Sequence, residues 1–221
     1  RNKASQTTAV PCMEYENDDI GLCFRDPARG LPPGDTRPCL YLLRRDLVNL
    51  YGSETDPPRT VNLSPILGCV GMMGGFDLMS LLSTASKHGS EKLFKGFLET
   101  YAKIPTDEAT ALYRLRCGQV HAYSLVSYPL DRDPAPAIYK FMLDDEHAAG
   151  APVLEPLPDG LEDGVVVKNF YVNYWSLKDF FISTVKALQF EVEKREQPLL
   201  SNFMGAMKAT AKLEVTKSAP R

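Results

Sequence analysis

Residues 112–125 read LYRLRCGQVHAYSL and mark the point at which the pattern of the chain changes. Before this stretch, Thr106, Asp107 and Glu108 indicate a helix start, because threonine can cap free backbone amides and early acids suit the positive end of the helix dipole. After it come short segments rich in aromatic and β-branched residues, which is typical of strands. The stretch therefore predicts the end of a helix and the beginning of a β region.

Three further helices are predicted ahead of this one. The first is indicated by leucines that recur three and four positions apart, which is the period of an amphipathic helix. The second has a clear start, since Ser64 can cap the free amides and Pro65 suits the first helical position. The predicted ranges are 38–50, 65–82 and 93–101.

The second predicted helix contains four glycines, at positions 68, 71, 74 and 75. A glycine costs a helix about 1 kcal/mol relative to alanine, so a group of them predicts that a neighbouring helix packs closely against this one. The same apolar run is marginal for crossing a membrane, because Asp77 interrupts it. A buried helix is therefore expected, and no membrane partner.

After residue 122 the sequence predicts a small antiparallel meander and then helices again. The expected strands are 123–130, 137–143 and 165–172, and the segment 150–164, rich in proline and glycine, is expected to be a loop. Helices are expected from Tyr174 to near Pro198 and over 199–212. The predicted fold is mainly α with a small antiparallel β elaboration, or α+β overall.

Composition favours one large domain. A chain of 221 residues that is 44% hydrophobic and 24% charged can bury a full core. Residues 1–36 are expected to form an extended or loosely ordered segment, followed by a single domain over 37–221 with its β insertion at about 123–172. The formal net charge of −3 argues against bulk electrostatic attraction to nucleic acid, so a nucleic-acid function requires a local basic site.

The cysteines and histidines indicate neither a disulfide framework nor a metal site. Five widely spaced cysteines without a C-x-x-C pair favour free thiols in a reducing compartment, and hence a cytoplasmic location. The three histidines, His88, His121 and His147, lie far apart, so no metal and no cofactor are expected. Arg1 to Val10 is polar and is not followed by an apolar stretch, so no secretory signal is expected.

The end of the fourth helix carries the residues with the most chemistry. RNA cleavage without metal needs a group that moves a proton and a cation that stabilises the phosphoryl transition state, roles that histidine and arginine can fill. At about 100° per residue, His121 lies about 20° from Arg114 and about 40° from Cys117, but about 140° from Arg116. Arg116 must therefore reach around the helix or complete a site with another chain.

These residues resemble the motif of the HEPN superfamily, R-x4-6-H near the end of a helix. Arg116 to His121 matches the four-residue spacing, and Arg114 to His121 matches the six-residue spacing. The wider string is also similar to uncharacterised bacterial proteins that read roughly LYxLRNxLVHSFxL. The resemblance covers residues 38–125 and, more loosely, 174–195. Active members usually carry Asn, Asp or His after the arginine, where this chain has Cys117.

The resemblance implies a HEPN-like helical bundle that acts as a metal-independent endoribonuclease of a bacterial defence or toxin–antitoxin system. It implies His121 as general acid and base, Arg116 as the group that stabilises the transition state, and RNA as substrate. It also implies a homodimer in which two motifs face each other, and an antitoxin or other protein as partner. Arg114, Cys117 and Asp77 are expected to support the site.

Each of these residues also has a structural interpretation. His121 is equally a histidine satisfied at a helix end, Arg116 a salt-bridged surface residue, and Cys117 a small buried hydrophobe. Asp77 either pairs with Arg114 or Arg116, since a buried carboxylate needs a partner, or faces water. The alternative function is a catalytically inactive helical module that binds RNA, a nucleotide or a protein, or a subunit of a larger assembly around which residues 1–36 wrap.

Overall fold

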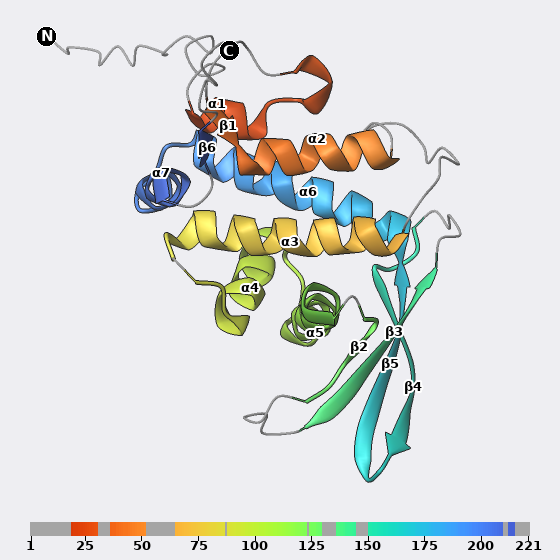
Figure 1. Cartoon of the computed structure of the whole chain (residues 1–221). Coiled ribbons are helices and arrows are strands. Elements are labelled where there is room, and N and C mark those ends of the chain that lie inside the picture. Colours follow the sequence, from red (N-terminus) through yellow and green to blue (C-terminus); the bar gives the residue numbers. More distant parts are fainter. Residues whose placement is uncertain are drawn as a thin grey trace, which may run out of the picture.

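The computed structural model describes residues 19–30, 36–51, 65–86, 88–122, 124–129, 136–144, 150–209 and 212–214. Helices form most of this part of the chain, and a small sheet lies at one end of it (Figure 1). The predicted α+β class agrees with this arrangement. The helices are α1 (Asp19–Phe24), α2 (Cys39–Tyr51), α3 (Pro65–Thr84), α4 (Glu91–Phe97), α5 (Thr106–Ala122), α6 (Tyr174–Glu193) and α7 (Leu199–Ala209), with a 3-10 turn η2 (Pro27–Arg29) and a π-helical turn η3 (Leu98–Ala102).

Helix α3 is the centre of the helical part. It runs between α2 and α6 on one side and α4 and α5 on the other (Figure 1), and it also contacts α7. Its length and mean hydropathy of 1.6 would let it cross a membrane, but 56% of its most apolar 18-residue window is buried inside the protein, and a buried helix is what the sequence predicted. At its middle, the ring of Phe76 packs against Phe94, Phe180 and Phe181, which come from α4 and α6.

Two of the α3 glycines allow the close helix packing that the sequence predicted. A methyl group on Gly75 would overlap the ring of Phe181, whose Cζ lies 2.8 Å away, and would lie 3.0 Å from Leu43 Cδ2. A methyl group on Gly71 would lie 3.0 Å from Leu47 Cδ2. Gly74, in contrast, has open space where a side chain would stand.

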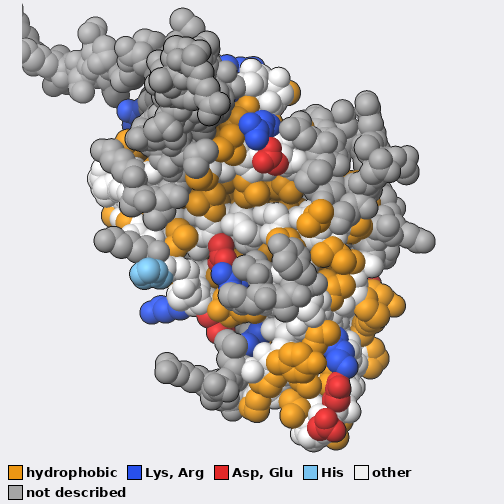
Figure 2. Space-filling model, in the orientation of Figure 1, with side chains coloured by type: hydrophobic (Ala, Val, Ile, Leu, Met, Phe, Trp, Pro, Cys, Tyr) orange, Lys and Arg blue, Asp and Glu red, His pale blue; other side chains and the backbone are white. Residues whose placement is uncertain are grey.

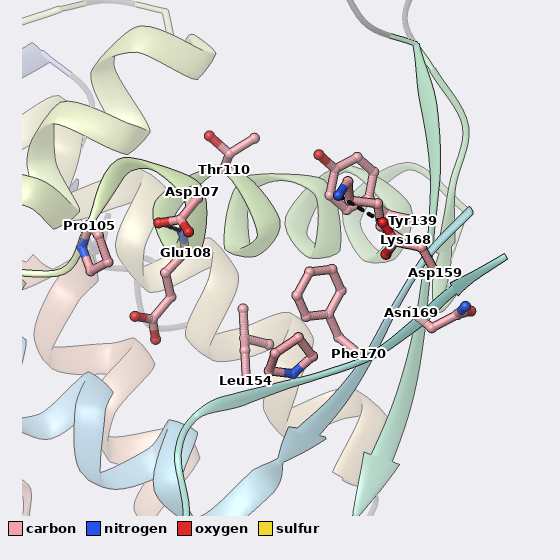
Figure 3. Close-up of a pocket in the computed structure, with 11 residues that line it drawn as sticks. Pro105, Asp107, Glu108, Thr110, Tyr139, Leu154, Asp159, Lys168, Asn169 and Phe170 are labelled. Carbon is pink, nitrogen blue, oxygen red and sulfur yellow. Dashed lines mark hydrogen bonds and ion pairs between the residues drawn. The ribbon is translucent and has the colours of Figure 1, made fainter. Parts of the chain in front are cut away.

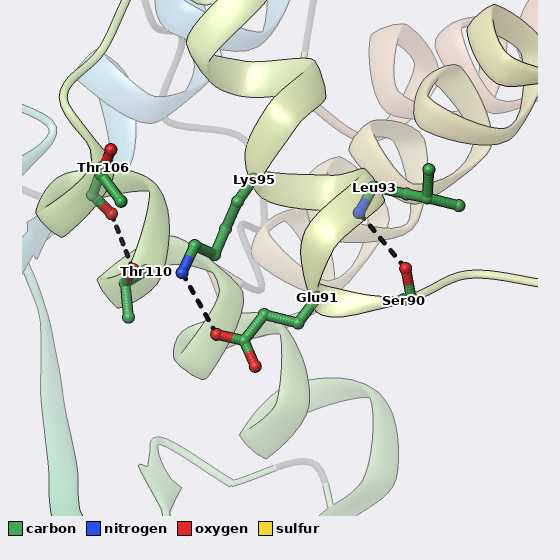
Figure 4. Close-up of polar contacts among 6 residues, drawn as sticks. All are labelled: Ser90, Glu91, Leu93, Lys95, Thr106 and Thr110. Atoms are coloured by element: carbon green, nitrogen blue, oxygen red, sulfur yellow. Dashed lines mark hydrogen bonds and ion pairs between the residues drawn. The ribbon is translucent and has the colours of Figure 1, made fainter. Parts of the chain in front are cut away.

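The starts of α4 and α5 are held by local hydrogen bonds (Figure 4). Ser90 caps α4, because its Oγ accepts a hydrogen bond from the amide of Leu93 at 3.2 Å. Lys95 pairs with Glu91 one turn earlier, at 3.2 Å. The third predicted helix is α4 continued by η3, and α5 begins at Thr106, as expected. The proposed cap Ser64 of α3 lies outside the described residues.

The sheet differs from the predicted meander. Its order is β2-β3-β5-β4, and β3 pairs with β5 in parallel, so the sheet is mixed rather than antiparallel. The predicted loop 150–164 contains an entire strand, and a two-residue turn joins this strand to the next. The strands are β2 (Val126–Ser127), β3 (Ala137–Asp144), β4 (Leu154–Glu162) and β5 (Val165–Asn173), with a separate pair β1 (Thr36–Pro38) and β6 (Lys212–Glu214).

The sequence analysis did not predict strand β4, because prolines are unusual in a strand. β4 is the edge of the sheet, where a proline does not remove a hydrogen bond from a central ladder, and the pairing with β5 is irregular between Leu157 and Gly160. The turn that follows, Asp163–Gly164, has φ of 50° and 80°. Positive φ at both positions suits a tight hairpin, for which Asp-Gly is a preferred pair.

The first and last described segments meet. β1 pairs antiparallel with β6, with Arg37 opposite Leu213. Phe24 in α1 stacks on Phe203 in α7 with ring centroids 5.5 Å apart, and the Cys23 thiol lies 3.2 Å from the sulfur of Met207. Part of the segment expected to be extended is therefore a helix docked on the core, while residues 1–18 and 31–35 lie outside the described part.

Candidate functional site

Helices α3 and α5 join at an ion pair between Asp77 and Arg116. The Nε and Nη2 atoms of Arg116 both lie 2.6 Å from Oδ2 of Asp77, and each side chain is 18% exposed. Burial by itself would lower the pKa of Arg116, but the hydrogen bond and the charge of Asp77 outweigh it and raise this pKa. Of the two arginines considered as partners for Asp77, the structure pairs it with Arg116, and the guanidinium is fixed in place and charged.

Two further α5 side chains surround this arginine. The Cys117 thiol interacts with the Arg116 guanidinium and with the Tyr113 hydroxyl. Burial is the main cause that raises the pKa of Tyr113 to about 12, and the nearby sulfur of Cys117 adds to it. This phenol therefore stays protonated at neutral pH. Cys117 is half-buried and is not bonded to another cysteine. Cys117 thus contacts Arg116, and its supporting role in catalysis stays a prediction.

Arg114 lies on the sheet side of α5, away from the ion pair. It is 5% exposed, and its guanidinium carbon lies 5.7 Å from the centre of the Tyr139 ring on β3. A cation at this distance from an aromatic face is attracted to the ring. Arg114 thus helps to attach the sheet to α5, and the two arginines of the motif have separate surroundings.

Gly118 lies where the segment that follows α5 packs against the helix. The amide of Ser124 donates to the carbonyl of Gly118 at 3.1 Å, so the segment after α5 folds back across its last turns. A methyl group on Gly118 would lie 2.7 Å from the carbonyl oxygen of Ser124 and 2.9 Å from that of Val126. The same segment is also bonded to the sheet, because the amide of Phe141 on β3 donates to the carbonyl of Leu125 at 2.8 Å. Only glycine permits this backbone approach.

His121 belongs to the last turn of α5, and its side chain lies outside the described part of the structure. It follows Arg116 by five positions in the helix, which corresponds to about 7.5 Å along the axis and about 140° around it. The structure thus fixes the arginine of the motif and the helix that carries both residues. Among the described residues, no group of three His, Cys, Asp or Glu side chains is arranged to hold a metal ion.

Tyr113 is the site residue that the sequence interpretation missed. It precedes Arg116 by three positions and Cys117 by four, and residues at these spacings are neighbours on a helix surface. That spacing was the available signal. Cys23, Cys39, Cys69 and Cys117 are free thiols, as expected, whereas Cys12 lies outside the described residues.

The chain matches no protein-family model, no curated protein and no solved structure. The interpretation of the site therefore depends on the geometry of its own residues.

The energy of the Asp77–Arg116 pair can be measured with a double-mutant cycle. We expect Asp77→Ala, Arg116→Ala and the double variant to give a coupling free energy of about 1–3 kcal/mol in urea unfolding, because both charges are largely shielded from water. The control is the Lys140–Glu162 pair, whose side chains are 42% and 48% exposed. Its coupling is expected to be below about 1 kcal/mol. Equal couplings for the two pairs would contradict the prediction.

Proposed function

We propose that this protein is a metal-independent endoribonuclease in which Arg116 and His121 perform the reaction. The observation that carries the proposal is the fixed, charged guanidinium of Arg116 in the same helix as His121, five residues earlier. Such a preorganised cation stabilises developing negative charge more effectively than a mobile one, because no reorganisation is needed during the reaction. The HEPN-like motif and its RNase activity are part of this proposal.

The proposed reaction uses the ribose 2'-hydroxyl as nucleophile. His121 accepts the 2'-hydroxyl proton, the 2'-oxygen bonds to phosphorus, and the bond from phosphorus to the 5'-oxygen breaks. The leaving oxygen takes a proton from an imidazolium, and a 2',3'-cyclic phosphate remains. Arg116 stabilises the charge on the phosphoryl oxygens, and Asp77 is a positioning residue that acts through Arg116.

The proposal includes a homodimer with composite sites, since Arg116 and His121 point about 140° apart on one helix. If each site takes its arginine from one chain and its histidine from the other, Arg116→Ala and His121→Ala variants complement each other. A mixed dimer then has one intact site and one site that lacks both groups. We expect the two inactive variants to regain cleavage when they are mixed after mild unfolding and refolding, whereas sites contained within one chain give no recovery.

The experiment that tests the activity is cleavage of a mixed RNA pool in EDTA, with analysis of the product ends. Wild type is expected to give 2',3'-cyclic phosphate or 3'-phosphate ends, and His121→Ala and Arg116→Ala to lose about 100-fold or more of this activity. Matched controls are His88→Ala, an exposed histidine, and Arg45→Ala, an arginine paired with a carboxylate at 2.7 Å. Both controls are expected to cut like wild type.

A catalytically inactive binding module is the second candidate, and two observations favour it. Asp77 already neutralises Arg116, and on the face shown in Figure 2 the described acidic and basic side chains are interspersed rather than gathered into a basic area. Well-folded protein that cuts no RNA pool would favour this candidate. Its ligand would then be RNA, a nucleotide, an antitoxin-like protein or another subunit of an assembly.

A further inference from the structure

A hollow lies at the opposite end of α5 from Arg116. It encloses about 560 Å³ between the first turns of α5 and the strands β3, β4 and β5 (Figure 3). This volume is in the range of small-molecule sites. Glu108, on its rim, precedes Arg116 by eight residues, which is about 12 Å along the helix axis. The hollow, called the α5–sheet pocket below, is therefore separate from the proposed RNase site.

The sheet side of the α5–sheet pocket includes an apolar and aromatic area. Phe170 and Leu154 line it, and the ring of Tyr139 lies parallel to that of Phe170, with an interplanar angle of 3° and centroids 6.2 Å apart. In Figure 3, Glu108 extends from α5 into the same space as Leu154 and Phe170. A ligand in the pocket would thus lie between a carboxylate and an aromatic surface.

The charge of the pocket lining is negative. Asp107 and Glu108 stand on the α5 side, and Asp159 stands on the β4 side, where it pairs with Lys168 at 3.1 Å. Three acids and one base leave a net charge of −2 in this lining. Burial, and then the charge of Asp107, raises the pKa of Glu108, so its present surroundings disfavour the ionised form. The attraction of a cation placed beside Glu108 would offset this penalty.

We propose that the α5–sheet pocket binds an aliphatic diamine or polyamine. One ammonium group donates to the carboxylates of Asp107 and Glu108, the methylene chain lies on Leu154 and Phe170, and a second ammonium group reaches Asp159. Ammonium groups are attracted to aromatic faces as well as to carboxylates, so one ligand satisfies both walls. The negative lining disfavours phosphate-bearing ligands, and the described residues offer no set of three metal ligands.

Calorimetric titration of the full chain with spermidine tests the proposal. We expect saturable binding of one molecule per chain. 1,5-Pentanediamine is expected to bind about tenfold more tightly than n-pentylamine, because it contributes a second charge-assisted contact, and 1,5-pentanediol is expected not to bind. Absence of saturable binding by either amine would overturn the proposal. Binding of trilysine without binding of the free diamines would also overturn it and would indicate a peptide-docking surface.

Substitutions of pocket residues test whether the amine binds in the α5–sheet pocket. Glu108→Gln is expected to weaken spermidine binding about tenfold, and Phe170→Leu about threefold. The control Glu155→Gln removes an exposed carboxylate that is not part of the pocket lining, so it should change the affinity less than twofold. Equal weakening by Glu108→Gln and Glu155→Gln would show general attraction to acids and would overturn the site. Thermal unfolding shows whether each variant is folded. If Phe170→Leu does not fold, the result for Glu108→Gln is sufficient to test the site.

Discussion

Gly118→Ala is expected to lower the free energy of unfolding by about 3 kcal/mol, the largest effect predicted for a single methyl group in this chain. The new methyl group would lie 2.7 Å and 2.9 Å from the carbonyl oxygens of Ser124 and Val126. Because these are backbone atoms, they can retreat only if the whole segment between α5 and β3 shifts. The gain of about 1 kcal/mol in helix propensity from glycine to alanine does not compensate for this shift.

Urea unfolding of Gly118→Ala, measured beside Gly96→Ala, checks the prediction. Gly96 is a helical glycine in α4 with nothing within 4 Å of its missing side chain, so its replacement should be neutral or stabilising. Under the proposed function, Gly118→Ala should also lose RNA cleavage, since it displaces the end of the helix that carries His121. A Gly118→Ala protein as stable as wild type would show that the segment from Ser124 to Val126 lies elsewhere.

Gly75→Ala is the second large effect, and we expect it to destabilise the protein by about 2 kcal/mol. The methyl group would overlap the ring of Phe181 and approach Leu43 at 3.0 Å. Phe181 cannot simply rotate away, because its ring packs edge-on against Phe76 with centroids 5.3 Å apart. The helices α3 and α6 must therefore separate or the ring must leave its preferred orientation.

The adjacent Gly74 provides a matched control for this second prediction. It lies in the same helix, one residue away, with no atom within 4 Å of the position where a side chain would stand. Gly74→Ala is expected to raise the free energy of unfolding by about 0.5–1 kcal/mol, since alanine favours the helix. Thermal and urea unfolding of both variants should move in opposite directions. Equal destabilisation would mean that helix propensity, rather than contact with α6, decides the outcome.

Helices in which apolar residues recur at a regular spacing were predictable from this sequence. The ranges expected around α2, α3, α5 and α6 agree with the structure because apolar spacing and a proline at a helix start are local signals. The glycines of α3 predicted close packing, which Gly71 and Gly75 show and Gly74 does not. A local pattern indicates that some neighbour is close, but it does not show which glycine faces that neighbour.

The sheet was harder to predict because its pairing is not local. The parallel alignment of β3 and β5 depends on β4 lying on the outer edge, and Pro156 in β4 made that strand resemble a loop. Asp163–Gly164 was the signal that a hairpin lay there. β1 and β6 are three residues each, too short to show alternation, and their partners lie at opposite ends of the described chain.

The sequence indicated that Asp77 needs an arginine partner, but it did not indicate the geometry of the site. Helical spacing separated Arg116 from His121, and the lone carboxylate of α3 suggested an arginine partner. The choice of Arg116 over Arg114 depends on how α5 is rotated between α3 and the sheet. That rotation is set by long-range packing, such as the segment that crosses Gly118, and short-range patterns do not contain it.

The pairing of β1 with β6 and the stacking of Phe24 on Phe203 have a consequence for synthesis on the ribosome. Of the described helices, α1 emerges first, whereas α7, which supplies Phe203 and Met207 against it, emerges last. During elongation, the buried side chains Cys23 and Phe24 must wait without these partners, so the early chain presents apolar surface to chaperones or to other nascent chains. Docking of α1 on the helical core thus follows the exit of α7 from the ribosomal tunnel, so it occurs after the helices between them have been synthesised.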